Sequence, residues 1–599
     1  MLMLGAAPAV APAATSFGPL SGAAGCLVAP GSKSADNGTA DCGDGKGLLG
    51  ASAVAISPDG QNIYVASGTA GTTQASSFGS LEILRRNSAT GAISEVGCLS
   101  SDGTDGRDGA SGACVQTPSL LGADGVTVSP DGSAVFVTTN ISASVVAFAR
   151  DPATGSLSGL GCFQYRPPHG SKCPPANVFP GSGAVLTSAD GKALYVASPT
   201  EGSISTLIAG EVTSPSATAG SGVTVASIFG LLGTTEFLGN PCVAVNGFDG
   251  SCGVGIATRG LDALALSPDG AELYATAPGS EAVDVFTHDA SGTLTESSCL
   301  KVSAPPGLCR SSRLMNSPTQ LSISPDGRNV YVADGSENEG RVDVLARDPS
   351  TGALSDASCV EGSPAPKNHE ESEEEENKEE NNEPTPAGGD CDAVPGLESV
   401  DAIAVTGNGS EVYAIGDQSA VVFSRDPSSG KLTEVSCAAS EDSRCTSFPS
   451  LQGVEGAAVS PDGRFLYIAA AKIDAVLAFG VGSNVTTASA SASRAGIARV
   501  GVQCPRALRR PCSGQLELTR AVRARGAHRR RLQRIVAGGS RRFAIRPGAR
   551  TTISVHLSPT SRRLLFAHRR LRLMAIVRAD PLAGGSGYGR ALRLSLGPH

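Results

Sequence analysis

The sequence lacks tryptophan, and aromatic residues make up only 4% of it. No stretch approaches the roughly 18 uninterrupted apolar residues of a membrane-spanning helix, so we do not expect the chain to cross a membrane. Its 16 cysteines show no C-x-x-C spacing and no neighbouring histidine, which argues against a zinc site. The G-x-S-x-G motif of serine hydrolases is also missing. The chain instead contains 75 glycines and 37 prolines, a composition that favours many short strands over helices.

One segment recurs through the chain, first as VAISPDGQNIYVAS, residues 54–67. Each copy has two apolar runs separated by a turn of Pro, Asp and Gly, which is typical of a β-hairpin. A third run and a second turn follow most copies, as in VVAFARDPATGSLSGLGC from Val145, so each unit has four strands. The other six copies begin at Val126, Val185, Leu264, Leu321, Ile403 and Ala457. Repeated four-stranded units predict an all-β fold, a seven-bladed β-propeller.

The last copy, from Ala457, is incomplete, because it stops after its third strand and has no cysteine. The missing pattern occurs at the other end of the chain, where FGPLSGAAGC, residues 17–26, matches TGSLSGLGC of the second unit. We therefore expect the N-terminus to supply the outer strand of the last blade. This arrangement closes the ring and removes a free sheet edge.

Composition divides the chain into parts. Residues 1–16 are apolar and rich in small residues, like the end of a secretory signal peptide, and residues 17–483 contain the propeller repeats. Within the repeats, residues 361–390 are expected to be a disordered acidic insertion. Residues 484–496, rich in Ser, Ala and Thr, predict a linker, and residues 497–599 predict a small β-sandwich-like module, which we interpret as immunoglobulin-like.

The C-terminal module has a strong excess of positive charge, with about two dozen arginines against only Glu517 and Asp580. Arginine charge of this kind can bind an anionic polymer, such as cell-wall teichoic acid or polysaccharide. The module has few aromatic residues, Phe543, Phe566 and Tyr588, so base stacking is poorly supported and nucleic acid is not the expected partner. The alternative is that the arginines only solvate the surface.

The cysteines fall in close sequential pairs, about one pair per repeat. Such pairs predict local disulfides, which implies an oxidising compartment. The chain is therefore expected to be secreted or held at the cell surface, as a monomer. The predicted pairs are Cys26 and Cys42, Cys98 and Cys114, Cys162 and Cys173, Cys242 and Cys252, Cys299 and Cys309, Cys359 and Cys391, Cys437 and Cys445, and Cys504 and Cys512.

The repeats VAISPDGQNIYVAS and LSISPDGRNVYVAD, followed by F.RDP.TG.L, resemble the YVTN repeats of the lactonase-like seven-bladed propellers. That superfamily includes 6-phosphogluconolactonase and the carboxymuconate cyclases. The resemblance covers about residues 17–480 and implies the fold; the enzymes of the family use His, Arg and acidic side chains near the central pocket. None of these can be matched one for one here, since the propeller part holds only His169, His288 and His369.

Candidate ligand residues lie five positions before the Ser of each SPDG-like turn, where the inner strands are expected to begin. The seven positions are Ser52, Asp124, Gly183, Asp262, Thr319, Asp401 and Glu455. Four carboxylates that face one channel mouth repel one another unless they are solvated, protonated or shared by a cation such as Ca²⁺. The sequence thus predicts a calcium or polar-ligand site, and the alternative is that these residues cap loops or bind water.

A second candidate is the short loop between Cys162 and Cys173, which holds Arg166, His169 and Lys172. His169 and Arg166 are the candidate catalytic residues of a hydrolase, and an ordinary basic surface loop is the alternative. Because the repeat is regular while no catalytic set can be assembled, the sequence favours a binding or interaction scaffold with its ligand or protein partner at the channel mouth. A lactonase-like hydrolase is the competing hypothesis.

Overall fold

The computed structural model describes residues 16–596 apart from 21–22, 34–40, 70–77, 107–111, 168, 177–180, 182, 209–241, 246–251, 290–293, 305–306, 335–339, 364–390, 440–444, 448–451, 483–485, 494, 504–511, 524–531, 537, 547–548, 569 and 580–586. Residues 1–15 of the expected signal remnant, residues 364–390 of the acidic insertion and Cys504 therefore lie outside the described residues, whereas Ser16 and residues 361–362 belong to strands. No helix in the described part of the chain is long and apolar enough to cross a membrane. The chain forms two compact units, the propeller and a C-terminal module.

Each copy of the repeat forms one antiparallel sheet of four strands, as predicted. The described residues contain seven such sheets, which we call blades 1 to 7 in the order of their inner strands. The inner strands are β4 (Ala51–Ile56), β9 (Ala123–Val128), β14 (Val185–Thr187), β19 (Leu264–Leu266), β24 (Gln320–Ile323), β29 (Ala402–Val405) and β34 (Val454–Val459). The second strands are β5 (Asn62–Thr69), β10 (Ala134–Thr139), β15 (Ala193–Ser198), β20 (Glu272–Ala277), β25 (Asn329–Asp334), β30 (Glu411–Ile415) and β35 (Phe465–Ala470).

The two outer strands of each blade follow the second turn. The third strands are β6 (Phe78–Arg86), β11 (Ser144–Arg150), β16 (Ser203–Ile208), β21 (Ala282–His288), β26 (Arg341–Arg347), β31 (Ser419–Arg425) and β36 (Ala475–Gly482). The fourth strands are β7 (Ile93–Ser100), β12 (Leu157–Tyr165), β17 (Cys242–Ala244), β22 (Leu294–Lys301), β27 (Leu354–Gly362), β32 (Leu432–Ala439) and, for blade 7, β2 (Cys26–Val28).

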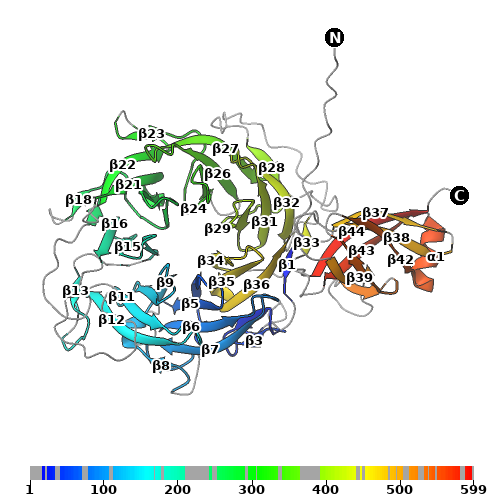
Figure 1. Cartoon of the computed structure of the whole chain (residues 1–599), viewed down its shortest axis with the longest axis horizontal. Helices are drawn as coiled ribbons and strands as arrows, with labels where there is room; N and C mark the ends of the chain where they lie inside the picture. The colour runs from blue at the N-terminus through cyan, green and yellow to red at the C-terminus, as the bar shows by residue number, and fades with distance from the viewer. Residues whose placement is uncertain are drawn as a thin grey trace, which may run out of the picture. The chain divides into compact units, whose positions relative to one another are not determined.

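The inner strands are neighbours around a closed ring, from β4 through β9 to β34, which lies beside β4 again (Figure 1). The N-terminus completes blade 7 as predicted: β2 pairs antiparallel with β36, with Cys26 opposite Leu477. A further short strand, β1 (Ser16–Pro19), pairs with the far end of β36. The predicted closure of the last blade by the N-terminal strand is therefore confirmed.

Each blade also carries a short fifth strand, which the sequence did not predict. It pairs in parallel with the fourth strand. The disulfide joins the fourth strand to a cysteine at or shortly before the start of the fifth; in blade 4, Cys299 lies directly opposite Cys309. The fifth strands are β8 (Val115–Gln116), β13 (Pro175–Ala176), β18 (Gly253–Val254), β23 (Cys309–Ser311), β28 (Asp392–Val394), β33 (Thr446–Ser447) and β3 (Gly43–Asp44). Seven of the eight predicted disulfides are present in the described residues. Each closes a local loop, which stabilises the fold by about 2–4 kcal/mol.

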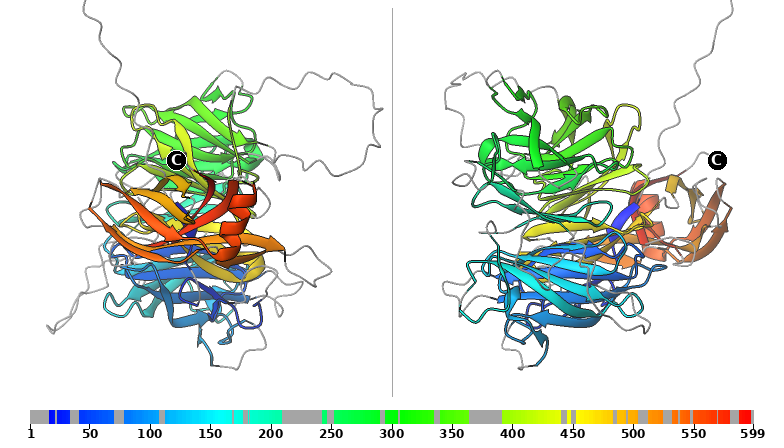
Figure 2. Two further views of the ribbon diagram at one scale, coloured as in Figure 1. Left: turned by 90° about the vertical axis from the view of Figure 1, so that its right-hand side faces the viewer. Right: turned by 60° about the vertical axis from the view of Figure 1, so that its left-hand side comes forward.

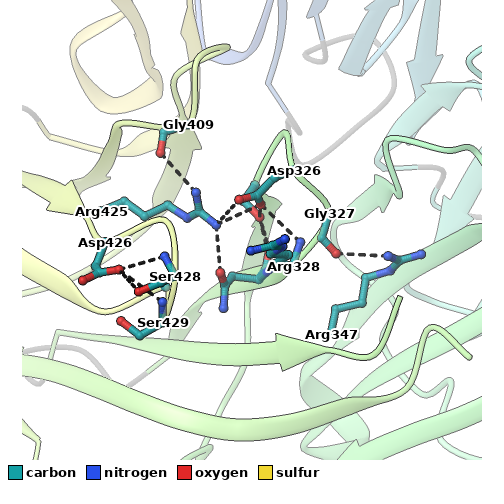
Figure 3. A network of polar contacts seen from close by, with 12 residues as sticks. Asp326, Gly327, Arg328, Arg347, Gly409, Arg425, Asp426, Ser428 and Ser429 are labelled. Atoms are coloured by element: carbon teal, nitrogen blue, oxygen red, sulfur yellow. Dashed lines mark hydrogen bonds and ion pairs between the residues drawn. The ribbon is translucent and has the colours of Figure 1, made fainter. Parts of the chain in front are cut away.

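Arginines at the ends of third strands bind the preceding blade, in an arrangement that we call the arginine clasp (Figure 3). Arg425 of blade 6 donates from Nε to the hydroxyl of Tyr331 in blade 5 over 2.7 Å, and from Nη2 to both carboxylate oxygens of Asp326 over 2.8 Å. Its Nη1 donates to the carbonyl of Gly409, in the turn between the first and second strands of the same blade. Arg86, Arg150 and Arg347 make the same contacts at their blade junctions. The Asp of SPDG is thus a structural anchor at these four junctions.

At the other three junctions the third strand does not end in this arginine, and the preceding blade keeps its tyrosine at two of them. The third strand of blade 3 ends at Ile208, and blade 2 has Phe136 where other blades have tyrosine. Blade 7 has no arginine at the corresponding position, and the Tyr413 hydroxyl of blade 6 donates to Glu411 instead. At the junction of blades 3 and 4, His288 stands in place of the arginine, and its ring centroid lies 6.3 Å from that of Tyr195.

The described residues of the C-terminal module form eight hydrogen-bonded strands and one helix. The strands are β37 (Thr486–Ala492), β38 (Ile497–Gln503), β39 (Cys512–Arg523), β40 (Leu532–Val536), β41 (Arg541–Ile545), β42 (Arg550–His556), β43 (Arg570–Ala579) and β44 (Gly587–Leu596). Helix α1 (Pro559–His568) contacts β43 and β44 (Figure 2). The expected linker, 484–496, contains β37, which pairs with β38 and β44 and so belongs to the sheet. The Thr, Ala and Ser residues of this segment are small and mostly polar, so its sequence lacks the alternation of large apolar and polar residues that predicts a strand.

Candidate functional site

The propeller exposes its inner strands to a central channel. Second strands such as β10 and β20 are completely buried, whereas most residues of inner strands such as β4 and β34 are half-buried. This contrast is expected if one side of each inner strand faces solvent at the centre of the ring. Side chains at the start of the inner strands are therefore positioned to meet a ligand in the channel.

The seven predicted positions follow one another around the ring. The hydroxyl of Ser52 in blade 1 donates to the backbone carbonyl of Asp124 in blade 2 over 2.9 Å. In the same way, Thr138 of blade 2 donates to the carbonyl of Gly183, and Thr276 of blade 4 to the carbonyl of Thr319. These bonds tie the start of an inner strand to the first or second strand of the preceding blade, which fixes the height of the predicted positions along the channel.

The structure brings the four predicted carboxylates into one electrostatic group. Partial burial, followed by the negative charges of Asp124, Asp401 and other carboxylates, raises the pKa of Glu455 to about 7, although its side chain is reached by solvent. Burial and the charge of Asp262 raise the pKa of Asp124 to about 6. Burial also raises the pKa of Asp262 and that of Asp401. The group therefore holds protons at a pH where isolated carboxyls are ionised.

A fifth carboxylate, Asp417, belongs to this group and was missed by the sequence reasoning. Its Oδ1 accepts hydrogen bonds from the backbone amides of Gly453 and Val454, at 2.6 and 3.0 Å, which positions the start of the strand that carries Glu455. Its backbone amide donates to Asp401 Oδ2, and its own Oδ2 lies 3.3 Å from Lys472 Nζ. The only sequence signal was a charged residue two positions after the second strand β30. We call Asp124, Asp262, Asp401, Asp417 and Glu455 the acidic mouth.

Asp124 and Asp401 are held by neutral partners. The side chain of Asn140 hydrogen-bonds Asp124, which lowers the pKa of that carboxyl and partly opposes the effect of burial. Asp124 Oδ2 points toward blade 3, since a methyl group added at Gly183 would lie 3.8 Å from it. The hydroxyl of Ser399 donates to Asp401 Oδ2 over 3.1 Å. The acidic mouth thus offers several oxygen atoms, the ligand type that Ca²⁺ prefers.

The basic loop lies elsewhere. Arg166 and His169 follow β12, the fourth strand of blade 2, and are separated from the inner strand β9 by two strands. Arg166, His169 and Lys172 are all exposed, and the Arg166 guanidinium lies over the Tyr165 ring at 4.9 Å. The structure therefore does not bring these residues together with the carboxylates of the acidic mouth.

No family model and no curated protein matches this sequence. Similar solved structures include a periplasmic gluconolactonase from Pseudomonas aeruginosa, at 16% identity over 83% of this chain and 99% of that chain, with a TM-score of 0.39. A candidate 6-phosphogluconolactonase from Bacteroides fragilis matches at 13% identity over 72% and 95%, with a TM-score of 0.42. The Cps50 (Swd1) β-propeller domain of Myceliophthora thermophila matches at 10% over 72% and 97%, with a TM-score of 0.40. The structural neighbours of this chain are thus lactonase-like and other β-propeller proteins.

Proposed function

We propose that the protein is a lactonase-like hydrolase that acts at the acidic mouth, with Glu455 as its general base and acid. The observation that carries this proposal is the pKa of Glu455, raised to about 7 in a solvent-reached position of the channel. A carboxyl group with such a pKa exchanges protons readily at neutral pH. The resemblance of the repeats to those of lactonase-like propellers supports the same function.

The ionised carboxylate of Glu455 would take a proton from a water molecule as the water oxygen bonds to the lactone carbonyl carbon. The ring C–O bond then breaks, and the proton held by Glu455 passes to the departing alkoxide oxygen. The product is an open-chain hydroxy acid, and Glu455 returns to its starting state. Neighbouring carboxyls of the acidic mouth that hold protons can donate hydrogen bonds to the oxygen that becomes negative.

The charge of the acidic mouth indicates the class of substrate. Five carboxyl groups around one opening repel a phosphate group, because like charges in a partly desolvated site interact strongly. We therefore expect an uncharged sugar lactone to be hydrolysed faster than its phosphorylated counterpart. Steady-state assays with gluconolactone and 6-phosphogluconolactone measure this preference.

Glu455→Gln tests the proposed chemistry. We expect kcat to fall by about 10²- to 10⁴-fold, the usual contribution of a general acid or base. In the unmodified protein, kcat/KM should rise with pH through about 7 as Glu455 loses its proton, and this rise should vanish in the variant. Glu361→Gln, an exposed carboxylate of the outer strand β27, is the matched control and should leave the rate unchanged. Equal rates in the two variants, after subtraction of spontaneous hydrolysis, would contradict the proposal.

A non-catalytic binding site at the same mouth is the second candidate function, and the mutual repulsion of the carboxylates favours it. A bound Ca²⁺ would neutralise this repulsion. Calorimetric titration of calcium into the metal-stripped protein should then show a Kd on the order of 10⁻⁶ M. A variant with Asp124, Asp262 and Asp401 changed to Asn and Glu455 to Gln should lose this binding. No heat in either protein would remove calcium as the ligand.

We propose further that the protein works outside the cytoplasm, either secreted or at the cell surface. Seven local disulfides support this location, because disulfides persist in oxidising compartments. A small uncharged lactone is also a substrate that can be met outside the cell.

A further inference from the structure

Exposed arginines gather on one part of the C-terminal module. They come from four elements, β38, β41, β42 and α1, and from the turn between β41 and β42. We call this set the arginine face. Its members are Arg499, Arg542, Arg546, Arg550, Arg562 and Arg563, all of them exposed.

Strand pairing joins the β38 and β42 parts of the arginine face, whereas β41 pairs with β39. Strand β38 pairs with β42, where Arg499 lies opposite Ser554 and Gln503 lies opposite Arg550. The inward residues of β42, such as Ile553, are buried, so the outward side presents arginine, hydroxyl and imidazole groups. Strand β41 contacts β42.

Helix α1 extends this surface at the start of β38. A methyl group added at Gly496 would lie only 2.8 Å from the Arg562 side chain, which places this arginine over the residues that lead into β38. The Arg562 guanidinium also covers the Phe566 ring at 5.7 Å. The large exposed aromatic ring of this face is therefore occupied by a protein cation.

The module has almost no carboxylates to neutralise this charge. From residue 479 to the end of the chain, the sequence contains only Glu517 and Asp580 as acidic side chains, and it contains no lysine. An ordinary solvated surface mixes both signs of charge. A surface with one sign only attracts polymers of the opposite charge over several ångströms.

We propose that the arginine face binds a phosphodiester polymer of the cell envelope. The planar guanidinium group matches phosphate oxygens through two parallel hydrogen bonds, and it stays charged at any physiological pH. The neighbouring hydroxyl groups of Thr552 and Ser554 can donate to the same oxygens. Such polymers are found at the location proposed above, which the seven disulfides support, and the covered Phe566 ring argues against stacking of nucleic-acid bases.

The full-length protein should bind poly(glycerol phosphate) in a salt-dependent manner, as measured by fluorescence anisotropy of the labelled polymer. The variant Arg542→Gln/Arg546→Gln/Arg550→Gln should bind at least about tenfold more weakly at 50 mM salt. The slope of log K against log salt should fall by about 2, since each lost phosphate contact on a flexible chain removes roughly 0.7. Arg310→Gln/Arg313→Gln/Arg328→Gln, which changes three exposed arginines of the propeller, is the matched control and should bind like the unmodified protein.

Each other outcome overturns the proposal. Equal loss in the two variants would show that binding follows total charge and not the arginine face. Binding that does not weaken as salt rises would rule out phosphate contacts. If a DNA duplex binds at the arginine face and displaces the polymer at equal phosphate concentration, the partner is a nucleic acid and not an envelope polymer. Circular dichroism of each variant confirms that the module remains folded.

Discussion

Replacing Arg425 by alanine should lower the free energy of unfolding of the propeller by about 3 kcal/mol, because the substitution leaves buried polar partners unpaired. The Arg425 side chain is almost fully buried and binds the Tyr331 hydroxyl and the Asp326 carboxylate of the neighbouring blade. Its Nη2 also donates to Asn329. A lysine cannot donate hydrogen bonds in the planar, forked geometry of the guanidinium group. Arg425→Lys should therefore recover little of the lost free energy of unfolding.

The arginine clasp can be followed through tyrosine fluorescence in urea. The chain has 8 tyrosines and no tryptophan, and Tyr64, Tyr274, Tyr331 and Tyr467 are clasp partners. Arg328→Ala is the matched control, since Arg328 lies in the same turn as Asp326 but is exposed. The clasp does not stabilise the ring if the Arg425→Ala and Arg328→Ala proteins unfold at the same urea concentration.

The clasp shows which part of the fold the sequence could not predict. The repeat period predicted the blades, their hairpins and the closure by the N-terminus, because each depends on local alternation or on a pattern that recurs. The arginine of the RDP motif also recurs, so it could be recognised in the sequence. Its partners were not, since Tyr331 lies 94 residues from Arg425 and belongs to another blade. A contact between two repeats leaves no periodic signal within either one.

The acidic mouth was predictable for a similar reason, and Asp417 was not. Asp124, Asp262, Asp401 and Glu455 occupy one position of the repeat, and equal positions in a ring face the same channel. Asp417 lies in a turn after β30, where the repeats differ in length and sequence. It enters the group through hydrogen bonds to the next blade, which only the folded backbone reveals.

Replacing Asp284 by asparagine should stabilise the propeller at alkaline pH. Asp284 lies in β21 opposite Cys299 and is completely buried. Neither of its carboxyl oxygens has a hydrogen-bond partner among the residues that the structure describes. Burial, and then the neighbouring charge of Glu296, raises the pKa of Asp284 well above its usual range.

The sign of the effect follows from the proton that the folded state holds. In the unfolded chain the pKa of an aspartate is about 3.9, so the unfolded state releases this proton at lower pH than the folded state. The stabilisation that comes from the proton on Asp284 is full below the unfolded pKa. It is lost as the pH rises toward the folded pKa, by about 1.4 kcal/mol for each pH unit. Asparagine carries no such proton, so the variant should gain on the unmodified protein as the pH rises from 5 to 8.

Urea midpoints at pH 5 and pH 8 measure this gain. Asp348→Asn is the control of opposite sign, because Ser350 lowers the pKa of this exposed turn carboxylate and its removal should bring no gain at pH 8. Glu82 and Asp343 occupy the same strand position in blades 1 and 5, opposite Cys98 and Cys359, and burial raises the pKa of each. If Asp284→Asn shifts the midpoint equally at both pH values, the proton on Asp284 does not carry the pH dependence. In that case the substitution acts only through packing beside the disulfide.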